Sequence, residues 1–150
     1  MAHFNLDPQS FLEPIAVHIG STAIGPGTFN LADAERVDIG KFESVLMACA
    51  DGGGTGTITI TPEESDTPSG TKTPLDGTGG MPNFVVEFAS GEFELKHRVI
   101  RCTGRRQFLN INIVVGGAAA ARPFVAFYGV RRIQASGASI EADLAPLQAS

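Results

Sequence analysis

Short stretches that alternate apolar and polar residues recur along this chain, with turn-forming residues between them. The clearest is 57–61, where threonine and isoleucine alternate with a period of two, so that Ile58 and Ile60 share one face. Such alternation is typical of a β-strand with one buried face. We therefore expect strands at 15–19, 34–39, 42–50, 57–61, 83–89, 92–101, 106–115 and 123–133.

The segments between these strands carry turn signals. Ser90-Gly91 predicts a two-residue hairpin, and Asp51-Gly52-Gly53-Gly54 predicts a looser turn. The run 42–50 is nearly all apolar, as expected for a central strand covered on both faces. Eight strands joined by turns predict an all-β fold, an antiparallel β-sandwich of jelly-roll type.

The predicted sandwich covers 15–134, between an extended N-terminal arm at 1–14 and a short C-terminal tail at 135–150. Prolines interrupt any helix in the arm, which nevertheless carries four large apolar side chains: Phe4, Leu6, Phe11 and Leu12. These side chains need cover, either from the arm's own domain or from a neighbouring subunit.

The composition supports short strands in one domain. The chain has 150 residues, with 18 Gly, 9 Pro, 10 Phe and no Trp. No stretch approaches the roughly 18 apolar residues of a membrane span, and the N-terminus lacks the pattern of an export signal. We therefore expect a soluble protein with no membrane partner, and its net charge of -5 argues against general nucleic-acid binding.

Charge is divided unevenly along the chain. Residues 96–132 hold eight of the eleven basic residues and no acid, whereas residues 1–95 hold fourteen of the sixteen acids. Within this basic segment, Arg101, Arg105 and Arg106 flank a turn at Thr103-Gly104, and Arg131 and Arg132 end the last strand. Such groups could bind nucleic acid, glycans or an acidic protein surface, and they predict a homo-oligomer in which the basic segment of one subunit meets the acidic first half of another.

Cofactor and metal motifs are weak. The glycine-rich run 52–56 precedes a strand and not a helix, so we expect no nucleotide cofactor. The acids Glu63, Glu64, Asp66 and Asp76 offer oxygen ligands but match no EF-hand, and we expect 62–82 to be an exposed loop without structural metal. Cys49 and Cys102 could form an inter-sheet disulfide, although the absence of an export signal favours reduced thiols.

No nucleophile and base stand in a recognisable catalytic motif, because the three histidines share no spacing and no serine lies in a GxSxG elbow. The sequence therefore predicts a protein that is not an enzyme and has no catalytic residues. A glycan-binding β-sandwich on a virion or cell surface is an alternative. The absence of Trp and the single Tyr weaken it, since sugar rings usually stack on exposed aromatic side chains.

The order of several segments resembles a known group of viral proteins. The segment Gly27-Thr28-Phe29-Asn30 leads to Phe42-Glu43-Ser44-Val45-Leu46, then to 58–66, and later to 105–111 and 124–133. In this order they resemble head decoration, or cement, proteins encoded beside the major capsid protein of tailed bacteriophages.

This resemblance covers about residues 15–134 and implies a structural virion protein that binds the outside of an icosahedral head and stabilises it. It also implies that the major capsid protein is a partner, that the protein is made in the host cytoplasm, and that a homotrimer is the favoured assembly. Phe4, Leu6, Phe11, Leu12, Arg101, Arg105, Arg106, Arg131 and Arg132 are then the candidate partner-binding residues.

Overall fold

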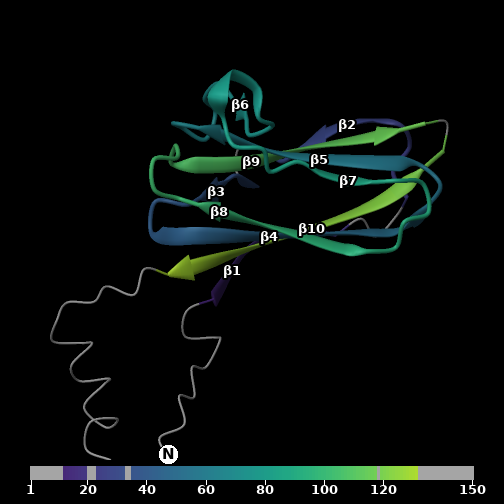
Figure 1. Ribbon diagram of the computed structural model, residues 1–150, viewed down its shortest axis with the longest axis horizontal. Helices are drawn as coiled ribbons and strands as arrows, with labels where there is room; N and C mark the ends of the chain where they lie inside the picture. The colour runs from purple at the N-terminus through teal and green to yellow at the C-terminus, as the bar shows by residue number, and fades with distance from the viewer. Residues whose placement is uncertain (1–11, 20–22, 33–34, 118, 132–150) are drawn as a thin grey trace, which may run out of the picture.

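The computed structural model describes residues 12–19, 23–32, 35–117 and 119–131. Within these ranges the chain is built from β-strands and one short 3-10 turn, η2, at Thr78–Gly80 (Figure 1). The strands are β1 (Leu12–Ile19), β2 (Gly27–Asn30), β3 (Val37–Asp38), β4 (Phe42–Gly54), β5 (Thr57–Ser65), β6 (Thr73–Pro74), β7 (Val86–Phe88), β8 (Leu95–Arg101), β9 (Phe108–Gly116) and β10 (Ala121–Arg131). No helix in these ranges has the length and apolar character needed to cross a membrane.

The strands form two antiparallel sheets stacked as two layers (Figure 1). One sheet has the order β1-β10-β4-β8, and the other has the order β2-β9-β5-β6, with β3 also pairing with β9 and β7 with β5. If β2 and β3, which both pair with β9, count as one interrupted strand, and β6 and β7, which both pair with β5, count as another, the layers follow the strand orders of a jelly roll, first-eighth-third-sixth and second-seventh-fourth-fifth. The predicted all-β sandwich of jelly-roll type is confirmed.

Alternation along the strands fills the space between the layers. Phe42, Val45, Met47 and Cys49 of β4 point inward and are buried, as are Ile58 and Ile60 of β5, in agreement with the sequence pattern. From the other strands, the core also takes Val86, Phe88, Ile100, Leu109, Ile111, Ile113, Val115, Val125 and Phe127. One continuous apolar core therefore holds the two sheets together.

One predicted turn and one predicted hairpin are wrong. Residues 51–54 continue β4, and the reversal falls at Thr55-Gly56 instead. Gly54 has a φ of 110°, and a Cβ there would overlap the Ala120 carbonyl, so glycine is needed where β4 ends. Ser90-Gly91 does not join a hairpin either, because β7 pairs with β5 in one sheet and β8 pairs with β4 in the other.

The expected exposed loop at 62–82 is also wrong in part. Pro62, Glu63, Glu64 and Ser65 belong to β5 and are buried, and β6 pairs with β5. Leu75 is fully buried and anchors the segment, since its N–H donates to the Pro62 carbonyl and its carbonyl accepts from Phe84. Exposed residues remain at 66–69 and 77–80.

The described sandwich begins at Leu12 and ends at Arg131. Leu12 pairs with Val130, so the last residues of the expected arm form the first part of β1. Phe4, Leu6, Phe11, Arg132 and the expected tail at 135–150 lie outside the described residues.

Candidate interaction surface

The outward side of the β1-β10-β4-β8 sheet is mostly apolar. The register places Leu95, His97, Val99 and Arg101 of β8 beside Ala50, Ala48, Leu46 and Ser44 of β4, in that order. The same β4 residues lie beside Phe124, Ala126, Tyr128 and Val130 of β10. We call nine of these residues the apolar face: Leu46, Ala48, Ala50, Leu95, Val99, Phe124, Ala126, Tyr128 and Val130.

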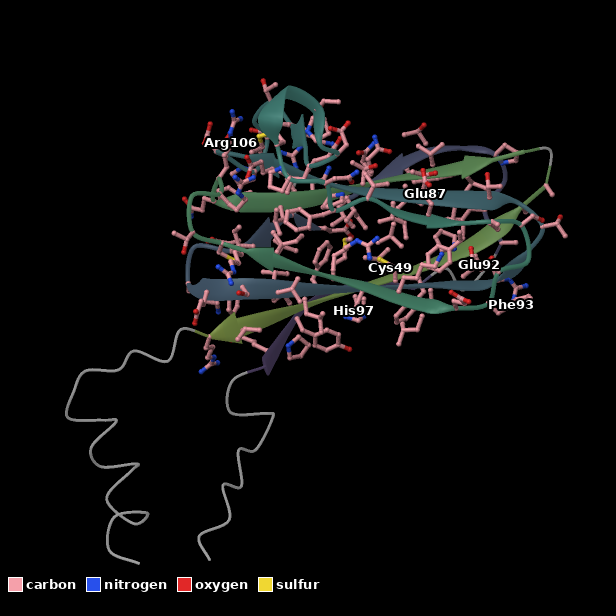
Figure 2. The ribbon with its side chains drawn as sticks, in the orientation of Figure 1. Cys49, Glu87, Glu92, Phe93, His97 and Arg106 are labelled. Carbon is pink, nitrogen blue, oxygen red and sulfur yellow. The ribbon has the colours of Figure 1, made fainter. Side chains whose placement is uncertain are left out.

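Exposure on the apolar face increases toward the edge strand β8. Leu95 is 72% exposed and Val99 is 54% exposed, and Phe93, just before β8, is 71% exposed. Leu46, Phe124 and Tyr128 are half-buried. Figure 2 shows His97 on the side of this sheet that is turned away from the other layer. Water therefore reaches large aliphatic side chains where a sandwich strand usually presents polar ones.

The outward side of the β2-β9-β5-β6 sheet is polar, as its strand register shows. Its register brings together Thr28, Asn30, Thr57, Thr59, Thr61, Glu63, Glu87, Asn110, Asn112 and Val114, which we call the polar face. Val114 is its exposed apolar side chain, at 40%. The two outer surfaces of one sandwich thus differ in chemistry, although both consist of alternating strands.

Large and small side chains form rows across the apolar face. Ala126 and Ala48 stand side by side in the middle, in line with His97. On one side of this alanine row lie Tyr128, Leu46 and Val99, and on the other side lie Phe124, Ala50 and Leu95. Small side chains thus occupy the middle of the face, where Ala126 is buried, and larger side chains lie on both sides of it.

Opposite charges stand at the two ends of β8. Glu94, just before the strand, and Arg101, its last residue, are both exposed. His97, also exposed, lies midway between them. Of these residues, His97 and Arg101 share the outward side of β8 with Leu95 and Val99, so the edge of the apolar face carries a base at one end.

The basic segment meets its acids within the same chain. Lys96 Nζ lies 2.9 Å from Glu92, Arg105 3.8 Å from Glu64, Arg106 3.7 Å from Asp66 and Arg131 2.8 Å from Glu13. Each pair joins a base of 96–132 to an acid of the first 95 residues. The charge division along the sequence is therefore at least partly satisfied by folding. Arg101, beside the apolar face, and Arg122 of β10 are further bases of this segment that are exposed.

Two basic residues of β8 close the side of the sandwich where the sheet edges meet. Lys96 Nζ donates to the Glu87 carbonyl over 2.7 Å and lies 4.9 Å from the centre of the Phe88 ring. Arg98 donates to the Val85 carbonyl over 3.2 Å. Since side chains alternate along a strand, these inward cations connect the sheets while Leu95, His97 and Val99 face outward. Inward-pointing charges of this kind also hinder an edge strand from pairing with a strand of another chain.

The four candidate metal ligands are held by the protein's own groups. Glu63 accepts from Asn110 Nδ2 over 3.1 Å, and Glu64 accepts from the Arg106 N–H over 3.1 Å. The Thr78 hydroxyl and N–H donate to Asp76 and lower the pKa of its carboxyl. In the described ranges, no three His, Cys, Asp or Glu side chains gather in the manner of a metal site.

The two cysteines are free thiols, in agreement with the favoured prediction. Cys49 is buried, and burial raises the pKa of its thiol to about 12. Cys102 is half-buried and lines a small pocket with Arg105, Arg106 and Gln107.

A larger, polar pocket lies near the seam between β7 and β8 and is lined by Asp76, Asn83, Val85, Glu87, Lys96 and Arg98. Its cations already donate to the Val85 and Glu87 carbonyls, and its Asp76 carboxyl accepts from Thr78. These groups are used in holding the fold, which makes the apolar face the stronger candidate site.

The comparisons with known proteins assign no family. No protein-family profile matches the chain, and no curated protein is significantly similar to it. The case for a function therefore rests on the residues and on the fold.

Of the sequence-predicted partner-binding residues, the structure places Arg101 beside the apolar face and Arg105, Arg106 and Arg131 in ion pairs of the monomer. For Leu12 it gives only the backbone pairing. The apolar face itself was missed. Its signal was the apolar run 42–50, in which Leu46, Ala48 and Ala50 alternate with core residues.

Proposed function

We propose that this protein is a non-enzymatic structural protein of a virus particle, a decoration protein on the outside of an icosahedral phage head. The observation that carries the proposal is the contrast between the apolar face and the polar face of one jelly roll. Contiguous exposed apolar surface marks protein contacts, and an assembly protein needs at least one such surface. The resemblance of 15–134 to phage cement proteins supplies the shell as the partner.

The apolar face can supply useful binding free energy. Complete burial of an exposed Leu, Val or Phe side chain contributes about 1.5–3 kcal/mol. Leu95, Val99 and Phe93 are each more than half exposed, so covering them would favour association. The described charges support the same interpretation, since the paired bases of 96–132 serve the fold and leave the apolar face as the distinctive outer surface.

The proposed partners are the major capsid protein and further copies of this chain, and the proposed location is the capsid surface after synthesis in the host cytoplasm. Binding sedimentation tests this proposal. The full chain is mixed with assembled shells of the major capsid protein encoded in the same genome, and bound protein is measured after pelleting.

We expect saturable binding and a higher disassembly temperature of the decorated shells. Shells of an unrelated phage are the control and should bind little. Absence of saturable binding to the cognate shells would refute the proposal. Retention on immobilised glycans without shell binding would favour the glycan-binding alternative.

A further inference from the structure

We infer that residues 1–11, the part of the arm before β1, cover the exposed edge of the apolar face of their own chain. Three large apolar side chains along this edge are each more than half exposed: Phe93, Leu95 and Val99. Residues 1–11 carry large apolar side chains that also need cover, namely Phe4, Leu6 and Phe11. The inference goes beyond the proposed function, because it concerns the chain without a shell. A shell that binds this face would have to displace the arm.

The arm starts from the same sheet and is long enough to cross it. Leu12 begins β1, and the strand register places it in one row with Arg101 of β8, across β10 and β4. Three strand spacings separate the two residues, which is about 14 Å. Val99 lies two positions from Arg101 along β8, and hence about 16 Å from Leu12. An extended chain advances about 3.3 Å per residue, so Leu6 can lie as far as about 20 Å from Leu12 and can cover Val99.

Charge supports one register of the arm on the face. Asp7 is the charged side chain of residues 1–11, and it lies five positions before Leu12, a reach of about 16 Å. Arg101 stands about 14 Å from Leu12 in the same row. Arg101 is exposed, and no carboxylate of the described ranges forms an ion pair with it. An arm that crosses the sheet along this row therefore brings Asp7 to an exposed base, and the attraction sets the register of the apolar contacts.

The size of the face suits a tethered segment better than a separate molecule. Four strands about 4.8 Å apart and about 20 Å long give a footprint of roughly 400 Å². A standard interface between separate proteins covers about 800 Å² on each partner, because association has to offset lost translational and rotational freedom. An arm joined to β1 stays at the face at an effective concentration on the order of millimolar, so a smaller contact can hold it.

The reactivity of one introduced thiol tests the cover on the full chain. Val99→Cys is combined with Cys102→Ser, and Cys49 stays buried in the core. We expect a maleimide to modify the introduced thiol about ten-fold faster when Phe4→Ser and Leu6→Ser are added, because the substituted arm no longer holds to the apolar edge. Equal rates with and without the arm substitutions would overturn the inference.

Val114→Cys is the matched control, because Val114 is an outward valine of the polar face and is 40% exposed. Its rate of modification should be the same with and without the arm substitutions. A parallel rise in the rates at both positions would show that the arm stabilises the whole sandwich instead of covering this face, and it would overturn the inference.

Disulfide trapping identifies the chain that supplies the arm. Leu6→Cys and Val99→Cys, again with Cys102→Ser, should close a disulfide within one chain on mild oxidation, because the two positions are in contact. Leu6→Cys with Val114→Cys should close one much more slowly. Non-reducing electrophoresis separates bridged monomers from bridged dimers. Bridged dimers would identify a second copy as the source of the arm, and absence of any bridge at position 99 would exclude the contact. Either result overturns the inference.

A charge exchange tests the register. Asp7→Arg should slow closure of the disulfide between positions 6 and 99 several-fold, and Arg101→Asp added to it should restore the rate. Closure at an unchanged rate in the Asp7→Arg variant would overturn the placement of Asp7 against Arg101.

Other covers of the face give different results. If the C-terminal segment 132–150 is the cover, Ile140→Ser with Leu144→Ser raises the reactivity of the Val99→Cys thiol and the arm substitutions do not. If the shell is the only cover, this thiol reacts in the free chain at a rate that the arm substitutions do not change, and added cognate shells protect it. Both results overturn the arm as the cover. The deciding experiments contain no shells, so failure of shell binding refutes the decoration function separately.

Discussion

At the scale of single residues, the two thiols differ in how far water can reach them. Cys49 lies in the core with a pKa raised to about 12 by burial, whereas Cys102 is half-buried. The thiolate is the form that attacks a disulfide reagent, so at about pH 8 we expect Cys102 to react first and Cys49 to react only after unfolding. Titration with a chromogenic disulfide reagent measures this. A Cys102→Ser variant that still reacts rapidly in its native state would contradict it.

Glu13 of β1 forms ion pairs with Lys41 and Arg131, and these pairs depend on pH. Hydrogen bonds from Lys41 and then Arg131 lower the pKa of this carboxyl from its ordinary value of 4.5. Because the folded pKa is depressed, the stabilisation is present above about pH 4.5 and is lost as the pH falls through the folded value. Glu13→Gln should therefore lower the melting temperature by about one to two degrees at pH 7.

The difference between Glu13→Gln and the unaltered protein should shrink from pH 7 to pH 3, because protonation of Glu13 as the pH falls through its lowered pKa removes the charge from this position. Glu43→Gln, at an exposed position of β4, is the matched control and should change the melting temperature less at pH 7. Thermal melts followed by circular dichroism at both pH values make the comparison. A pH-independent effect of Glu13→Gln would contradict the charge-based explanation.

At the scale of elements, β10 has a glycine at position 129 because the packing around this position leaves no room for a side chain. A Cβ at this position would overlap the ring of Phe42, which is buried at the start of β4. Gly129→Ala should cost about 1–3 kcal/mol of the free energy of unfolding, through overpacking. Urea denaturation measures this cost, and Gly25→Ala, where an added Cβ meets no atom within 4 Å, should cost little.

A double-mutant cycle identifies Phe42 as the cause. In a Phe42→Leu background, Gly129→Ala should lose most of its cost, because the shorter side chain leaves room for the added methyl group. Equal costs in both backgrounds would show that backbone conformation, and not the ring, limits position 129.

Strand positions were more predictable than strand partners. The alternation at 57–61 predicted that Ile58 and Ile60 are buried, and the structure confirms both. The chain beyond Phe88 looked like a hairpin because a Ser-Gly pair favours one locally. The partner of β8 is nevertheless β4, about fifty residues earlier, which local residues cannot specify. Likewise β2 has four residues and a glycine at its start, too short to show a period.

The apolar face could be predicted only in part, for a related reason. An apolar run such as 42–50 indicates two covered faces, and the jelly roll buries one of them. Which neighbour covers the second face depends on the strand order and on other chains. In the same way, the bases of 96–132 suggested an external partner, and only the folded register showed Arg131 beside Glu13.

At the scale of the whole molecule, the described sandwich begins with β1 at Leu12. β1 pairs with β10 along its length, from Leu12–Val130 to Ile19–Phe124. Deletion of residues 1–11 should therefore retain a single cooperative thermal transition. Deletion through residue 19 should abolish it, because β10 loses a neighbouring strand and the sheet loses its edge. Calorimetry compares the two truncations. Loss of cooperativity in the shorter deletion would show that the arm completes the core.

The pairing of β1 with β10 also brings the two ends of the sandwich together, since Leu12 lies opposite Val130 on adjacent antiparallel strands. A short peptide could join these ends, and new ends could be opened in the exposed segment 66–69, giving a circularly permuted chain with the same core. For genetic fusion, the same geometry means that a protein fused before Leu12 or after Arg131 would be attached at the same end of the same sheet.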